Sequence, residues 1–169
     1  MTKLYLVRHG ETIDNVNSIL QGQEQGQLTA NGIKQAEDVR DRLAQTPIDA
    51  FVSSDLKRAA DTCAIIAAPH HKSVDHTPLL RERDWGDFTG KYIPDLTNVQ
   101  WPDNVEPIEH LKSRARNFLT YIKVTYPGKN VLAVGHGIIN KAVQSVYYNK
   151  PMNEIPKMTN AEVRILILD

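Results

Sequence analysis

The first apolar run of the chain, Leu4-Tyr5-Leu6-Val7, is followed directly by Arg8-His9-Gly10-Glu11-Thr12. Four consecutive apolar residues without strict alternation are typical of a strand that is buried on both faces. Arg and His at the end of such a strand are costly to bury unless an anion or a hydrogen-bond partner meets them. Gly10 would also let the backbone approach a ligand closely. The stretch therefore predicts a strand that delivers Arg8 and His9 to a ligand, with a solvated surface turn as the alternative.

The rest of the chain alternates short apolar runs with segments of helical period. Further strands are expected at 50–53, 73–80 with a turn at Pro78, 130–134 and 162–168, and helices at about 29–44, 55–68, 107–126 and 137–148. The stretches 13–27 and 83–107 are rich in Asn, Gln, Gly or Pro, which favours loops. Short buried strands separated by amphipathic helices predict an α/β fold, a three-layer α/β/α sandwich around a mainly parallel sheet. In such sheets ligands bind beyond the carboxyl ends of the strands.

Three of the expected helices have a recognisable start. Thr29 can cap the first helix with its hydroxyl, and Ser54 or Asp55 can cap the second. Pro107 suits the first position of the third, where a backbone N–H has no partner in any case. Apolar positions at helical spacing should face the core, and in the first and third helices these are Ile33, Ala36, Val39, Leu43, Leu111, Ala115, Phe118, Leu119 and Ile122.

Composition narrows the class of protein. The 169 residues carry 20 Lys and Arg against 20 Asp and Glu, so the net charge gives no support to nucleic-acid binding or to a polybasic membrane surface. A single cysteine, Cys63, excludes an internal disulfide framework and a multi-cysteine zinc site. We expect one domain over residues 1–169, without metal or cofactor. No segment has the character of a signal or membrane helix, so a cytoplasmic location is expected.

Three other segments carry candidate site residues. Gly135-His136-Gly137 follows the expected strand at 130–134 and opens a helix, whose free N–H groups make an anion site. Arg58 lies in the first turn of another helix, where a cation is mildly unfavourable unless an anion binds beside it. Glu82 stands in a loop that contains glycine residues. Taken alone, each has an ordinary interpretation as a turn residue or a solvated charge.

Together these residues indicate a class of reaction. Two arginines, two histidines, a helix N-terminus and one carboxylate would surround the substrate. Arginine forks match the oxygen atoms of phosphate, and imidazole is a nucleophile near neutral pH. The set predicts phosphoryl transfer through a phosphohistidine, with a carboxyl group that protonates the leaving oxygen.

A series of motifs spans nearly the whole chain. They are Arg8-His9-Gly10-Glu11-Thr12 with Asn15, Leu28-Thr29-x-x-Gly32-x-x-Gln35-Ala36, Ser53-Ser54-Asp55-Leu56-x-Arg58-Ala59, Leu80-x-Glu82 with Gly86 and Gly90, and Gly135-His136-Gly137. As an ordered set they resemble the histidine phosphatase superfamily, which has the phosphoglycerate-mutase-like fold. The resemblance implies a three-layer α/β/α domain that works without a metal.

The resemblance also implies roles for particular residues. His9 would be the nucleophile and Glu82 the proton donor. The phosphoryl group would be held by Arg8, Arg58 and His136. Further substrate contacts are expected from Asn15 and Gly137.

The length of one segment bears on the choice of reaction. The chain between Glu82 and His136 is shorter than in the family's mutases, which favours a small phosphatase acting on a phosphorylated metabolite. The alternatives are phosphoglycerate mutase-type phosphoryl transfer, a protein phosphatase, and a domain that only binds phosphorylated ligands. Intact His9 and Glu82 argue against binding alone. One departure from the family lies at Val105-Glu106-Pro107, where many phosphatase members have Gly-Glu-Ser, and it affects the loop expected to select the substrate.

Overall fold

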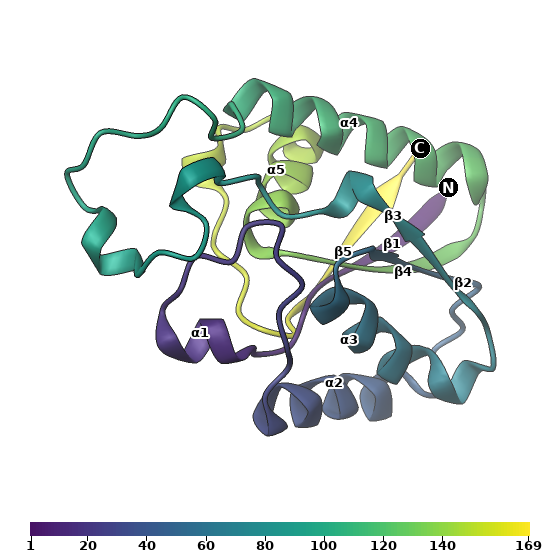
Figure 1. Ribbon diagram of the computed structural model, residues 1–169. Coiled ribbons are helices and arrows are strands. Elements are labelled where there is room, and N and C mark those ends of the chain that lie inside the picture. Colours follow the sequence, from purple (N-terminus) through teal and green to yellow (C-terminus); the bar gives the residue numbers. More distant parts are fainter.

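A single five-stranded sheet lies at the centre of the protein, in a computed structural model that describes residues 1–169. Its strands are β1 (Thr2–Arg8), β2 (Ala50–Ser54), β3 (Val74–Thr77), β4 (Asn130–Gly135) and β5 (Val163–Leu168). They stand in the order β3-β2-β4-β1-β5 (Figure 1). Strands β1 to β4 are parallel, and β5 pairs antiparallel with β1 at one edge.

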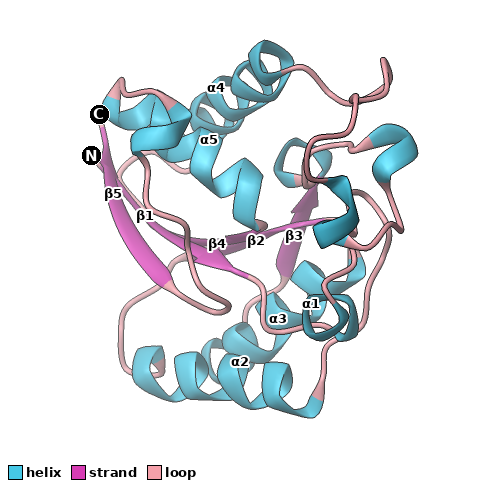
Figure 2. Cartoon of the chain, turned by 90° about the vertical axis from the view of Figure 1, so that its left-hand side faces the viewer, coloured by secondary structure: helices cyan, strands magenta, loops and turns pink.

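Helices cover both faces of this sheet. The α-helices are α1 (Ile13–Asn17), α2 (Ala30–Leu43), α3 (Lys57–Ala67), α4 (Ile108–Thr125) and α5 (Gly137–Tyr148). Figure 2 shows α4 and α5 above the sheet and α2 and α3 below it. The predicted three-layer α/β/α fold with a mainly parallel sheet is therefore confirmed. None of the helices combines the length and the apolar character that a membrane span requires.

Alternate residues of the central strands contribute to two separate hydrophobic cores. On β1, Leu4 and Leu6 belong to the core that includes α4 and α5. Tyr5 and Val7 belong to the core that includes α2 and α3. Because both faces are covered, consecutive positions of the strand must be apolar. The expected inward positions of α4 are all buried, whereas Ile33 on α2 is 42% exposed.

The expected loop at 13–27 contains a short helix. Thr12 caps α1 by accepting a hydrogen bond from the N–H of Asn15, and the Asn15 side chain accepts one from the N–H of Thr12. This reciprocal capping box supplies the helix start that the polar composition hides. As a result Asn15 is held in a defined position close to the end of β1.

The start of α3 differs from the prediction. Neither Ser54 nor Asp55 caps the helix, because its N-cap is Leu56, which makes no side-chain capping bond. The N–H of Lys57 instead donates to Oε1 of Gln25 at 2.9 Å. The loop around Gln25 is thereby drawn over the first turn of α3, where Arg58 lies. A smaller difference concerns Pro107, which is the N-cap of α4 and not its first residue.

The strand register determines which residues meet. Arg8, the last residue of β1, lies opposite Gly135, the last residue of β4. His9 and His136 therefore leave the sheet side by side. On its other side β4 pairs with β2, so Ser54 and the start of α3 reach the same edge.

Candidate active site

The two strand-end histidines are buried and in contact. His9 is 2% exposed and His136 is fully buried. Their ring centroids are 5.1 Å apart, with an angle of 60° between the ring planes. Two imidazoles withdrawn from water at the end of a sheet require either hydrogen-bond partners or a ligand.

Hydrogen bonding defines the tautomer of His9. Its Nδ1 lies 2.7 Å from the carbonyl oxygen of Gly10. A carbonyl can only accept, so Nδ1 carries the proton and Nε2 keeps its lone pair. Burial lowers the pKa of His9 well below its usual value; the charges of Arg58 and Arg8 lower it further, although the bond to Gly10 acts in the opposite direction. His9 is therefore neutral at physiological pH, with a nucleophilic nitrogen available.

His136 is fixed from the neighbouring strand. Its Nε2 lies 2.9 Å from Oγ of Ser54, the last residue of β2. Burial lowers the pKa of His136 well below its usual value, and the charge of Arg58 adds to this effect. Nδ1 of the same ring is buried without a hydrogen-bond partner. His136 thus offers one unsatisfied nitrogen beside His9.

Arg58 projects from the first turn of α3 and is 1% exposed. Its Nη2 donates to the carbonyl of Gly22 at 2.8 Å, and its Nη1 donates to the carbonyl of Glu24. Burial lowers the pKa of Arg58 to about 10, against the opposing effect of Glu82, so the guanidinium stays charged at neutral pH. Backbone carbonyls of a loop therefore hold this cation at a helix start, where the helix dipole opposes it.

Arg8 has fewer partners. Its Nη1 donates to the carbonyl of Met158 at 2.8 Å, which ties the end of β1 to the segment before β5. Burial lowers its pKa, while Glu82 and Glu162 act in the opposite direction. Like Arg58, it has a buried Nε without a hydrogen-bond partner.

Unsatisfied buried atoms are concentrated at this site. Only five buried side-chain nitrogen or oxygen atoms lack a hydrogen-bond partner, and three of them are Nε of Arg8, Nε of Arg58 and Nδ1 of His136. The other two are Nε2 of His70 and Oδ1 of Asn140. Nearly all buried polar groups in proteins are bonded. Two cationic donors and one imidazole nitrogen gathered at one place fit an anion with several oxygen atoms.

The side chain of Glu82 reaches the first turn of α5 from the loop between β3 and α4. Its Oε2 accepts from the N–H of Ile138 at 3.0 Å, and its Oε1 accepts from the N–H groups of Ile139 and Arg83, both at 2.9 Å. The N–H of Gly137 makes no such bond and remains available at the first position of the helix. One helix N-terminus thus holds a carboxylate and keeps a free donor.

These groups open into one pocket of about 240 Å³. Six of the seven residues predicted from the sequence line it, and His136 lies behind them against His9. Its lining residues are Arg8, His9, Asn15, Ile19, Leu20, Gln21, Gly22, Arg58, Glu82, Trp85, Ile93, Gly137, Ile138, Lys141 and Lys157. Oδ1 of Asn15 is used within α1 and by Asn160, so the Asn15 amide faces the pocket with Nδ2 as its remaining donor.

The role expected for Gly10 is wrong in one respect. A Cβ at this position would lie 2.5 Å from the carbonyl oxygen of Gly32 in α2. The close approach that requires glycine is therefore to another part of the backbone and not to a ligand. The pairing of these two glycines brings α2 against the turn that carries His9.

Sequence reasoning did not assign several residues of the site, among them Ser54, Lys141 and Lys157. Ser54 was recognised as part of a motif, but its bond to His136 depends on the pairing of β2 with β4. Lys141 follows Gly137 by four residues and so lies on the same face of α5, which the sequence does signal. Lys157 comes from the irregular segment before β5, and no pattern in the sequence indicates it.

Comparisons with known proteins agree with this geometry. The histidine phosphatase superfamily (branch 1) matches residues 4–169. An uncharacterized phosphatase, PhoE of Bacillus subtilis (strain 168), is 33% identical over 166 residues, which cover 95% of this chain and 86% of that protein. A metal-independent phosphoserine phosphatase of Arabidopsis thaliana is 32% identical over 85% of this chain and 67% of its own length.

The fold has close structural neighbours as well. The structure of Bacillus stearothermophilus YhfR superposes with a TM-score of 0.92 at 27% identity, covering all of this chain and 92% of YhfR. The chain thus belongs to the histidine phosphatase superfamily. Within that class it is an enzyme of the phosphatase kind, which is also how PhoE and the Arabidopsis thaliana relative are named.

Proposed function

We propose that this phosphatase hydrolyses phosphate monoesters of small metabolites through a phosphohistidine on Nε2 of His9. In the first step Nε2 forms a bond to phosphorus while the ester P–O bond breaks. The leaving oxygen takes a proton from the carboxyl group of Glu82. In the second step water attacks the phosphohistidine, Glu82 accepts its proton, and the N–P bond breaks to release phosphate.

One observation supports this proposal above all. His9, whose Nε2 keeps its lone pair, lines one pocket with Arg8 and Arg58 and contacts the ring of His136. Nε of each arginine and Nδ1 of His136 are buried and have no partner within the protein. A phosphoryl group supplies oxygen acceptors for these nitrogens, and the guanidinium charges offset its negative charge. The free N–H of Gly137 and Nδ2 of Asn15 would add two further donors.

Most of the rate enhancement must come from positioning and charge stabilisation. Enzymes that hydrolyse phosphate monoesters can require rate enhancements near 10²¹-fold, equivalent to about 28 kcal/mol of activation free energy. A general acid supplies only about 10²- to 10⁴-fold. Holding the nucleophile in line and neutralising the equatorial oxygens must therefore contribute more than Glu82 does.

The cations beyond the phosphoryl site bear on the choice of substrate. Four cationic side chains and a single carboxylate, Glu82, line the pocket. Arg8 and Arg58 suffice for a phosphoryl dianion, and neither Lys141 nor Lys157 forms an ion pair with a carboxylate. We infer that the preferred esters carry a second anionic group, either a carboxylate or another phosphate.

The reaction is tested by phosphate release from a panel of esters. The purified protein should hydrolyse p-nitrophenyl phosphate and several metabolite esters without a bisphosphate primer, and the His9→Ala variant should not. Strict dependence on a bisphosphate would favour mutase-type transfer instead. Turnover confined to phosphopeptides would favour a protein phosphatase. Binding of phosphate esters without any turnover would show that the protein is a ligand-binding domain and not an enzyme.

The second anionic group is tested with Lys141→Met. We expect KM to rise about tenfold for phosphoserine and for phosphoglycerate, the effect of losing one partly desolvated ion pair. KM for glycerol 3-phosphate, whose alcohol part is neutral, should stay nearly constant. Equal changes for charged and neutral esters would contradict the assignment, and comparison of phosphoglycerate with a sugar bisphosphate distinguishes a carboxylate from a second phosphate.

A further inference from the structure

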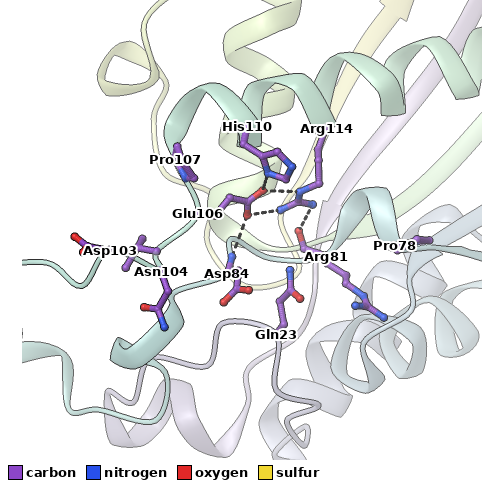
Figure 3. Close-up of a pocket in the computed structure, with 11 residues that line it drawn as sticks. Gln23, Pro78, Arg81, Asp84, Asp103, Asn104, Glu106, Pro107, His110 and Arg114 are labelled. Carbon is purple, nitrogen blue, oxygen red and sulfur yellow. Dashed lines mark hydrogen bonds and ion pairs between the residues drawn. The ribbon is translucent and has the colours of Figure 1, made fainter.

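A second and larger pocket, of about 510 Å³, is lined by Arg81 and Asp84, which flank Glu82 in the sequence. Figure 3 shows Glu106, His110 and Arg114 together in its wall. The Glu106 side chain is 5% exposed and the Arg114 side chain 14% exposed. A nearly buried ion pair this close to the active site raises the question of what it holds.

Every oxygen of the Glu106 carboxylate is occupied. Arg114 donates from Nε to Oε2 and from Nη2 to Oε1, both at 2.8 Å. Nδ1 of His110 lies 2.6 Å from Oε2, and the N–H of Asp84 donates to Oε1 at 3.0 Å. Burial by itself raises the pKa of Glu106, but the bonds from Arg114 and from the Asp84 N–H outweigh it and lower the pKa to about 2. The carboxylate is therefore charged over the working range of the enzyme.

Arg114 connects this carboxylate to the backbone around Glu82. Its Nη1 donates to the carbonyls of Leu79 at 3.0 Å and Arg81 at 2.8 Å. Its Nη2 also approaches the carbonyl of Glu82 at 3.4 Å. The bond to the Arg81 carbonyl is visible in Figure 3. One guanidinium thus binds a carboxylate and three carbonyl groups, which a lysine could not do.

The main chain of Glu106 secures the other side of the same segment. Its N–H donates to the carbonyl of Asp84 at 2.8 Å, and its own carbonyl accepts from Nε of Arg83 at 2.8 Å. Residues 81–84 have no regular secondary structure. Their conformation therefore depends on these bonds, which fix the backbone both before and after Glu82.

We propose that Glu106 and Arg114 are positioning residues that hold Glu82 in line with the leaving oxygen of the substrate. This inference rests on the proposed role of Glu82 as proton donor. A general acid must lie within hydrogen-bond reach of the atom it protonates. A displacement of 1 Å can lower a rate about 10²-fold. The carboxylate of Glu82 is held against α5, and the Glu106–Arg114 pair fixes the backbone from which it extends.

The leaving group separates positioning from a merely structural role. An alkoxide is a strong base and needs a proton as it departs, whereas p-nitrophenolate is a weak base and needs little assistance. A misplaced Glu82 therefore slows alkyl esters selectively. A loss of folded protein slows both kinds of ester equally. The value of kcat/KM reports the step in which the leaving group departs, without the later hydrolysis of the phosphohistidine.

The experiment measures kcat/KM on glycerol 3-phosphate and on p-nitrophenyl phosphate for Glu106→Gln and Arg114→Lys. We expect each variant to lose about 10- to 100-fold on the alkyl ester and less than about threefold on the aryl ester. Ile122→Ala, a core change on the same helix, is the matched control for lost stability. It should alter both esters by the same factor.

A double variant supplies the second readout. If Glu106 acts through Glu82, adding Glu106→Gln to Glu82→Gln should cause no further loss on the alkyl ester. Multiplicative losses, equal losses on the two esters, or no loss in the single variants would overturn the proposal. Failure of the proposed function looks different, because the wild-type protein would then hydrolyse neither ester. Arg114→Lys provides the same comparison should Glu106→Gln fail to fold.

Discussion

Two groups of buried charge, one around His9 and one around Glu106, differ in how fully they are bonded. Around His9, both arginines and His136 keep a buried nitrogen without a partner. Around Glu106, both carboxylate oxygens are bonded, and Arg114 reaches three backbone carbonyls. Unsatisfied buried groups are unfavourable for the free protein and indicate a place for a ligand. Fully bonded groups stabilise the chain around them and indicate a positioning role.

The largest effect is expected from a substitution that breaks the Glu106–Arg114 pair. Arg114→Met should lower the free energy of unfolding by about 3–5 kcal/mol, because it leaves the Glu106 carboxylate buried without its main partner. Urea unfolding followed by circular dichroism measures this. A loss below about 1 kcal/mol, the range of exposed ion pairs, would show that the pair contributes little to stability.

The corresponding change in the phosphoryl site should behave in the opposite manner. Arg8→Met removes a cation with one hydrogen bond to the protein, so stability should change little. The value of kcat/KM should fall about 10²- to 10³-fold, as for the loss of one transition-state donor. Added inorganic phosphate should raise the melting temperature of the wild type by ligand linkage. The same phosphate should stabilise Arg8→Met much less, and an equal shift in both proteins would place the anion elsewhere.

A smaller effect concerns acid stability. The pKa of Glu106 is about 2 in the folded protein, below its ordinary value of 4.5. A lowered folded-state pKa contributes stability that is present above the ordinary value and is lost as the pH falls through the folded value. The wild type should therefore lose unfolding free energy more steeply between these two pH values than Glu106→Gln does. Parallel curves from unfolding titrations would show that Glu106 is not held as a charged group.

Local sequence patterns account for the layers of the fold and for most of the site. The four consecutive apolar residues at 4–7 predict a doubly buried strand, and β1 contributes to both cores as this requires. Arg8 ends β1, and His9 and His136 directly follow β1 and β4, so parallel pairing is enough to bring them together. Glycine at 137 and lysine at 141 share one face of α5, which helical spacing also specifies.

Long-range contacts account for what the sequence does not show. Gln25 supports the start of α3 from a distant loop, and no pattern near Ser54 or Asp55 could indicate this. The departure at Val105-Glu106-Pro107 was expected to affect substrate choice. That stays a prediction. What the sequence does not show is that Glu106 bonds Arg114, eight residues further along the chain. Contacts such as these depend on how irregular segments pack against each other, and this packing leaves no periodic pattern in the sequence.

The central claim is that Nε2 of His9 carries the phosphoryl group between substrate and water. Rapid acid-free quenching of the enzyme during turnover of a radiolabelled ester, followed by peptide mapping, tests it directly. We predict acid-labile, base-stable label on the peptide that contains His9, and none in His9→Ala. Rapid turnover with no label on that peptide, or undiminished turnover by His9→Ala, would contradict the account.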